Sequence, residues 1–227
     1  AQAPDLIVTN ARIYTVDQNR PVVDAMAIRG GRIVATGPAR LITAMKGSST
    51  QVVDLDGKTV IPGMIDAHVH LWDPQRFRIP WIDGSALLNQ RYLLKEYRAH
   101  TAGLPIEAFV YLQVEVAPAY ALLEAQFVAE LAAEDRRLRG IVAWAPLEDG
   151  ECARSYLAAL TRGAPLVKGV RRIVQGEPDP RFCLQPGFVR GTQLLPEYGL
   201  SCDICIHHTQ LAATIELVRQ CPEVQFI

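Results

Sequence analysis

The sequence predicts an α/β chain whose larger part is an incomplete (β/α)8 TIM barrel, preceded by a small β module. Between residues 61 and 227, short apolar runs alternate with amphipathic stretches, a pattern typical of parallel strands joined by right-handed helical crossovers. Residues 1–60 carry strand and turn signals instead. No glycine-rich nucleotide motif follows any strand, and polar residues gather at several strand ends, which favours a barrel over an open sheet.

The composition excludes several classes of function. The chain has 227 residues, of which 49% are hydrophobic, and a net charge of -1, so it can bury a sizeable core. This charge balance predicts no affinity for nucleic acid or for acidic membranes. No apolar run reaches the roughly 18 residues of a membrane span. We expect a small-molecule substrate as the partner and leave homo-oligomer formation open.

The first and last residues of the sequence each lead to an expectation about the rest of the protein. The chain begins Ala-Gln-Ala-Pro without an initiator Met, and small residues of this kind often surround a signal-peptidase cut. A processed signal and a trimmed chain are both open, as are cytoplasmic and periplasmic locations. The sequence stops at Ile227, inside an apolar run, so we expect the protein to continue.

The β module is predicted to be one small antiparallel sheet. A loosely alternating run, Leu6–Val16, ends at a turn cluster. Ala25–Arg29 and Arg32–Ala35 flank Gly30-Gly31, and residues 52–55 and 58–61 flank Asp56-Gly57; both pairs are hairpin signals. The module holds no His and no clustered carboxylates, so we interpret it as a structural layer.

The barrel portion contains five β/α units and the start of a sixth strand. After a first strand that ends near His70, strands are predicted at residues 108–116, 139–145, 166–175, 201–207 and from 222 onward. Helices are predicted at residues 85–100, 119–137, 151–161, 186–198 and 210–220.

The first barrel strand carries the strongest candidate site. Asp66, His68 and His70 occupy alternate positions, so their side chains share one face of an extended chain. Two imidazoles from one strand supply half of a tetrahedral metal shell. A His-x-His pair also arises by chance, and its place at the end of the first strand of a barrel favours metal binding.

The second strand predicts a candidate catalytic residue. Phe109, Tyr111, Gln113 and Glu115 share one face, which we expect to point into the barrel, while the apolar face of Val110 and its neighbours packs on the helices. Glu115 lies at the C-terminal end of this strand. It is a candidate metal ligand or general acid/base, and a structural ion pair is the alternative.

Later strands add substrate-binding candidates. Arg171 and Arg172 face opposite ways, and we expect Arg171 inward with Gln175 on its face, although either guanidinium can bind an anion. The other arginine should reach solvent or an ion pair. On the fifth strand, His207 is the candidate catalytic residue for the barrel mouth, and a structural His bonded to a carbonyl is the alternative.

Two motifs carry a resemblance to a known family. The stretch from Asp56-Gly57-Lys58 to His70 resembles the amidohydrolase superfamily, in which a β-sandwich-like module precedes the barrel. Lys168-Gly-Val-Arg-Arg172 and the segment that ends at Ile227 look like its sugar-lactone and dicarboxylate-lactone hydrolase branch.

This resemblance implies a hydrolase in which His68 and His70 bind a divalent metal, expected to be one zinc ion, and Arg171 helps to bind substrate. The family's general base, an Asp on a later strand, is expected beyond Ile227, so the fragment alone should be inactive. Some lactonases of this branch work without a metal, in which case the two imidazoles would bind substrate.

We therefore expect hydrolysis of a sugar-acid or dicarboxylate lactone by water attack on its carbonyl. The alternatives are cyclic-amide or other C–N hydrolysis, decarboxylation within the same superfamily, and a catalytically silent barrel.

Overall fold

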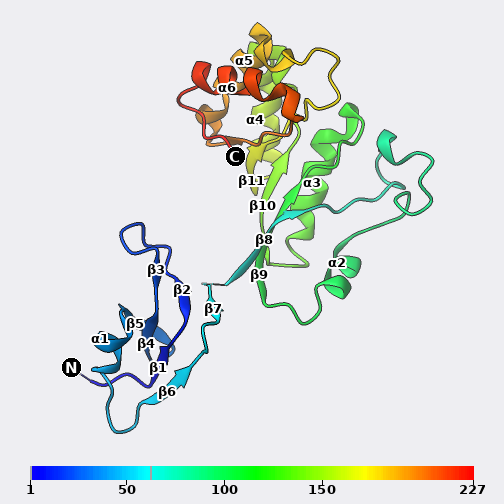
Figure 1. The fold of residues 1–227 in the computed structure, drawn as a ribbon. Helices are drawn as coiled ribbons and strands as arrows, with labels where there is room; N and C mark the ends of the chain where they lie inside the picture. Colours follow the sequence, from blue (N-terminus) through cyan, green and yellow to red (C-terminus); the bar gives the residue numbers. More distant parts are fainter. Residues whose placement is uncertain (1, 62) are drawn as a thin grey trace. The chain divides into compact units, whose positions relative to one another are not determined.

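The computed structural model describes residues 2–61 and 63–227, which form two compact units (Figure 1). The first unit ends at Met64 and the second runs from Ile65 to Ile227. No helix in these described ranges is long and apolar enough to cross a bilayer.

The first unit is a small sandwich of two sheets with one short helix. The larger sheet has the strand order β5-β4-β1-β6 and the smaller has the order β3-β2-β7. The elements are β1 (Leu6–Thr9), β2 (Arg12–Tyr14), β3 (Val22–Val23), β4 (Ala25–Arg29), β5 (Arg32–Gly37), α1 (Ala39–Thr43), β6 (Gln51–Asp54) and β7 (Thr59–Val60). Buried Val8, Ile13 and Met26 bring both sheets into one apolar cluster, and Ile42 of α1 packs in a second cluster with Ile7.

One of the two predicted hairpins is confirmed and the other is wrong. β4 and β5 pair antiparallel across Gly30-Gly31, both of which have positive φ. Asp56 and Gly57 also have positive φ, but they join strands of different sheets: β6 pairs parallel with β1, and β7 pairs parallel with β2. The chain crosses between the sheets here and again at Asn10, whose carbonyl accepts the Gly57 N–H at 2.7 Å. The expected single antiparallel sheet is therefore two sheets with mixed pairing.

The second unit is a curled five-stranded half-barrel, as predicted. Its strands lie in chain order, and the pairings β9–β10, β10–β11 and β11–β12 are parallel. Helices connect successive strands (Figure 1). The strands are β8 (Met64–Val69), β9 (Ile106–Leu112), β10 (Leu138–Ala143), β11 (Val167–Val170) and β12 (Ser201–Cys202). The α-helices are α2 (Leu94–His100), α3 (Ala121–Leu131), α4 (Ala153–Gly163), α5 (Pro186–Gln193) and α6 (Leu211–Gln220).

The two faces of β9 are the reverse of our expectation. Tyr111 is fully buried and its hydroxyl donates to Glu124 on α3 at 2.7 Å, while the Phe109 ring packs on Tyr97 of α2. These aromatic residues therefore face the helices, and Val110 faces the barrel interior beside Gly140. The expectation assumed one uninterrupted alternation from Phe109 to Glu115. β9 ends at Leu112, so Gln113 and Glu115 lie in the loop, and their direction says nothing about the faces of the strand.

Several elements are shorter than predicted. β11 stops at Val170 and β12 at Cys202, and the last predicted strand is a single bridge between Cys202 and Phe226. α2 begins at Leu94, nine residues after the predicted start at Ser85. The backbones of Trp72 and Tyr92 bond to each other at 2.8 and 2.9 Å, which holds the intervening chain as a loop.

Candidate active site

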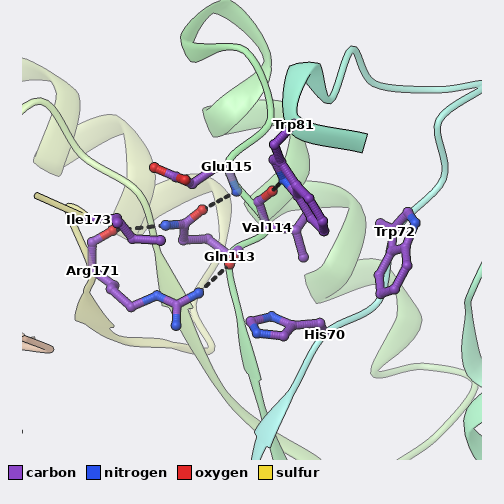
Figure 2. Close-up of a pocket in the computed structure, with 8 residues that line it drawn as sticks. All are labelled: His70, Trp72, Trp81, Gln113, Val114, Glu115, Arg171 and Ile173. Atoms are coloured by element: carbon purple, nitrogen blue, oxygen red, sulfur yellow. Dashed lines mark hydrogen bonds between the residues drawn. The ribbon is translucent and has the colours of Figure 1, made fainter. Parts of the chain in front are cut away.

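A pocket lies at the C-terminal ends of the barrel strands, where the sequence predicted the site. We call it the histidine pocket, and Figure 2 shows its lining: His70, Trp72, Trp81, Gln113, Val114, Glu115, Arg171 and Ile173. Its residues follow β8, β9 and β11, together with Trp81 of a short helical turn at Pro80–Ile82. The cavity volume is about 260 Å³.

The paired imidazoles converge on one point. The Nε2 atoms of His68 and His70 are 3.1 Å apart, and the two rings stand at 86° to each other. His70 Nδ1 lies 2.8 Å from the carbonyl oxygen of Leu112. Because a carbonyl only accepts, Nδ1 carries the proton, so the Nε2 lone pair of neutral His70 faces His68 Nε2 and accepts its hydrogen bond when no metal is bound.

This geometry suits one metal ion. Two nitrogens bound to a tetrahedral zinc at ~2.0–2.1 Å are roughly 3.3 Å apart, close to the separation seen here. Burial lowers the pKa of His70, with smaller contributions from the charges of Arg171 and His68, although the Leu112 bond opposes the shift; the net effect favours the neutral form that binds metals. Residues 2–61 and 63–227 contain no metal-binding cluster of three or more His, Cys, Asp and Glu residues. Within these ranges, His68 and His70 are the two candidate metal ligands brought together at this point.

Asp66 lies apart from this pair, toward the start of the strand. Its carboxylate accepts the Tyr97 hydroxyl at 3.3 Å and the His68 amide at 3.4 Å. Its contacts are those of a structural carboxylate.

Arg171 brings an unpaired positive charge to the pocket. Its side chain is only 6% exposed, and none of the carboxylates that the structure describes lies within ion-pair distance of it. One terminal nitrogen donates to the Gln113 carbonyl at 2.6 Å, and the Gln113 side chain donates back to the Arg171 carbonyl at 3.1 Å. The Nε atom is buried without a partner. A buried guanidinium in this state favours an anionic ligand.

Arg172 is in the opposite state. It forms ion pairs with Glu148 at 2.9 Å and Glu177 at 2.6 Å, and it lies over the Phe182 ring. Gln175, the third predicted substrate-binding residue, is exposed and donates to the Ile206 carbonyl at 3.3 Å. Neither side chain lines the histidine pocket.

Glu115 stands at the rim of the pocket with a strained backbone. Its φ is 51°, a conformation that non-glycine residues seldom adopt outside functional or tightly held positions. Its amide donates to the side-chain oxygen of Gln113. Desolvation by the pocket walls raises the pKa of its carboxyl, although Arg172 and Arg171 oppose this shift.

The structure does not bring His207 into the histidine pocket. Its side chain is exposed and its amide donates to Gln210 at 2.8 Å, at the start of a short helical turn. Our expectation relied on strand alternation through residue 207, whereas β12 ends at Cys202. Asp203, two residues from Ser201 on the same strand end, is partly buried instead, and burial raises its pKa.

Sequence reasoning missed the aromatic part of the site. Trp72 and Trp81 form one wall of the histidine pocket, and the indole N–H of Trp81 donates to the Val114 carbonyl at 2.5 Å (Figure 2). Their position in the loop that follows the His-x-His strand was the available signal.

A second pocket adjoins the first. Its lining residues, two of which also line the histidine pocket, are Pro80, Trp81, Glu115, Val116, Ala117, Pro118, Trp144, Glu148 and Arg172. The shared residues are Trp81 and Glu115.

Comparison with known proteins identifies the family. A family model described as Amidohydrolase matches residues 65–227. The chain belongs to the amidohydrolase family. It is 26% identical over 184 residues to an uncharacterized protein of Sinorhizobium fredii, a match that covers 72% of this chain and 60% of that protein. It is 40% identical over 70 residues to N-substituted formamide deformylase of Arthrobacter pascens, which covers 31% of this chain and 13% of that enzyme.

Solved amidohydrolase structures share the fold. An amidohydrolase from Burkholderia multivorans with bound zinc is 26% identical, with a TM-score of 0.59, over 71% of this chain and 55% of that one. A probable 2-pyrone-4,6-dicarboxylic acid hydrolase from Acinetobacter baumannii, 13% identical with a TM-score of 0.52 over 72% of this chain and 56% of that one, supports the barrel fold alone. The chain spans between 12% and 60% of the length of the relatives that it matches.

Proposed function

We propose that this amidohydrolase hydrolyses an acidic lactone, of a sugar acid or a dicarboxylate, with a divalent metal. The observation that carries the proposal is the combination found at one pocket. Two imidazole nitrogens lie 3.1 Å apart, and His70, one of this pair, lines the same cavity as a buried guanidinium without an ion pair; His68 is exposed beside the cavity. An acidic lactone has the two matching features, a scissile carbonyl and a carboxylate.

His68 and His70 would hold the metal. A bound divalent ion, most simply one zinc, polarises a carbonyl and lowers the pKa of a water. The zinc in the Burkholderia amidohydrolase supports this choice. The Leu112 carbonyl fixes the His70 ring by accepting from Nδ1, which keeps Nε2 directed at the same point as His68 Nε2.

Arg171 would bind and orient the substrate carboxylate. Its position is set from both sides, because Gln113 accepts from the guanidinium and donates to the Arg171 backbone. A carboxylate bound to this guanidinium satisfies a charge that is otherwise unpaired, so binding energy is gained at a preorganised group.

Hydrolysis also requires a proton to move. The water oxygen bonds to the acyl carbon as one of its O–H bonds breaks, the ring C–O bond breaks, and the departing alkoxide takes up the proton that the water lost. Glu115 can carry this proton from the water to the alkoxide, because its raised pKa makes its carboxylate a stronger base than an ordinary one. His207 stays a predicted catalytic residue.

The test uses His68→Ala and His70→Ala in the full-length protein. We expect loss of bound metal, measured by elemental analysis, together with loss of hydrolysis of a panel of acidic lactones. Arg139→Ala is the control for a general effect of substitution on this sheet, because Arg139 is exposed on β10 outside both pockets. Wild-type metal content and turnover in the two histidine variants would refute the proposal.

C–N hydrolysis is the second candidate. It is favoured by the local identity to N-substituted formamide deformylase, an enzyme named for action on N-substituted formamides. The same imidazole pair can serve either reaction, so the substrate panel decides between them. Turnover of cyclic amides or N-formyl compounds in preference to matched lactones would select this candidate.

A further inference from the structure

The tryptophans of this chain are concentrated on the two adjoining pockets. The sequence has three: Trp72 lines the histidine pocket, Trp144 lines the second pocket, and Trp81 lines both. Trp81 is 49% exposed. Large aromatic side chains that remain exposed around a cavity are typical of a surface that buries an apolar ligand group.

The two charged side chains that line the second pocket alone, Arg172 and Glu148, are already paired. Arg172 and Glu148 pair at 2.9 Å, and Arg172 also pairs with Glu177. The histidine pocket, in contrast, presents the unpaired guanidinium of Arg171. A polar ligand group would therefore find its partners in the histidine pocket, whereas the second pocket has mainly apolar contacts to offer.

The apolar wall of the second pocket is preformed. The Trp144 ring is held edge-on against Tyr156, with centroids 5.7 Å apart and an interplanar angle of 81°. Val116 is buried, and Pro118 adds a rigid ring to the same wall. The cavity volume is about 330 Å³. For comparison, an apolar cavity of roughly 150 Å³ can hold benzene.

We propose that the second pocket is a subsite for an aromatic ring of the substrate. This inference deepens the proposed function and rests on it: the substrate is an acidic lactone with an aryl substituent, whose carbonyl and carboxylate occupy the histidine pocket. Trp81 and Glu115 border both cavities, so one ligand that extends past them would place its carbonyl in the first and its ring in the second.

The kinetic test compares two γ-butyrolactone carboxylates that carry a phenyl or a methyl substituent at the same ring carbon. In the full-length protein we expect kcat/KM to favour the phenyl compound by about ten- to a hundredfold, the gain from burying a ring. Trp144→Ala should bring this ratio close to unity.

Two further variants guard against misfolding. Ala117→Trp fills the second pocket and leaves the Trp144–Tyr156 contact in place; it should also lower the phenyl-to-methyl ratio. Tyr198→Ala is the matched control, because it truncates an aromatic side chain that lines neither pocket, and it should keep the wild-type ratio. Thermal unfolding verifies that each variant is folded.

A binding measurement separates this inference from the proposed function. Calorimetric titration with benzylsuccinate and methylsuccinate, which resemble ring-opened products, requires no turnover. Tighter binding of benzylsuccinate that Trp144→Ala abolishes supports the subsite, even if no lactone is hydrolysed and the proposed function fails. Equal binding of the two acids, or a phenyl preference that persists in both Trp144→Ala and Ala117→Trp, overturns the subsite.

Discussion

The histidine pocket and the second pocket share a wall, yet their arginines are in opposite states. Arg171 and Arg172 are neighbours in the chain and leave β11 on opposite sides. Arg171 is buried with no carboxylate of the described residues beside it, whereas Arg172 is held by Glu148 and Glu177. Removing one partner of a buried ion pair destabilises a fold, and a buried charge that has no partner lowers stability unless a ligand completes it. Binding energy for an anionic ligand is therefore available at Arg171 and not at Arg172.

Arg171→Met should give the largest effect on activity. Removing the guanidinium deletes a charge-assisted bond to the substrate carboxylate, so kcat/KM for an acidic lactone should fall about a hundredfold. Stability should change by less than ~1 kcal/mol, because loss of the Gln113 bond is offset by removal of a buried charge. Steady-state kinetics and denaturant unfolding measure the two quantities. Undiminished turnover would show that Arg171 does not bind the substrate carboxylate.

Arg172→Met should show the reverse pattern. It leaves the partly buried Glu148 and Glu177 without their cation, and we expect a loss of about 1–3 kcal/mol in unfolding free energy. Turnover of the same lactone should fall by less than the Arg171 variant's loss, since Arg172 does not line the histidine pocket. If the folded Arg172 variant loses as much kcat/KM as Arg171→Met, both arginines bind the substrate.

A further group of paired charges lies at the N-terminal ends of the barrel strands, opposite to the two pockets. Asp135, just before β10, pairs with Arg137 at 2.8 Å and with Arg98 at 3.0 Å. The bonds from Arg137, and then from Arg98, hold the pKa of Asp135 far below its ordinary value of 3.8. This stabilisation is present above pH 3.8 and is lost as the pH falls toward the folded-state pKa.

Asp135→Asn should therefore cost about 1–2 kcal/mol near neutral pH. Its difference from the wild type should shrink as the pH falls below 3.8. Urea unfolding as a function of pH measures both, and a difference that stays constant with pH would show that the carboxylate charge is not responsible. Hydrolytic activity should be unaffected, because Asp135 lines neither pocket.

Regular structure was predictable where local periodicity determined it. The alternation of His68 and His70 predicted two imidazoles on one face, and their Nε2 atoms are 3.1 Å apart. The order of strands and helices followed from the alternation of apolar runs, and the half-barrel confirms it.

The same reasoning carries less weight where strands end. Gln113, Glu115 and His207 lie beyond the last paired residue of their strands, so a period of two no longer determines their direction: Gln113 and Glu115 line the histidine pocket as expected, whereas His207 does not. Glu115 leaves the extended region altogether, with a φ of 51°. The contact of Trp144 with Tyr156 joins the residue that follows β10 to α4, and no local pattern encodes such a tertiary contact.

The smallest expected effect concerns the carboxyl that supports the pocket loop. One oxygen of Glu124 accepts both the Tyr111 hydroxyl at 2.7 Å and the Val114 amide at 3.0 Å. Glu124 is 3% exposed, and burial raises its pKa, although the bonds from Val114 and Tyr111 oppose the shift. Glu124 therefore differs from Arg171 and Arg172: it is a buried acid that has hydrogen-bond partners, yet burial still disfavours its charged form.

Glu124→Gln keeps an oxygen to accept both bonds and removes the charge. An acid whose folded-state pKa is raised loses stability as the pH rises above its ordinary value of 4.5, so the variant should gain on the wild type over that range. The gain at neutral pH should be below ~1 kcal/mol, since the amide introduces a buried donor. Glu124→Leu, which cannot accept either bond, is the control and should destabilise the protein at every pH. If Glu124→Gln is less stable than the wild type and the deficit grows with pH, the ionised carboxylate itself holds the loop, and the neutral form is not the one that supports the pocket.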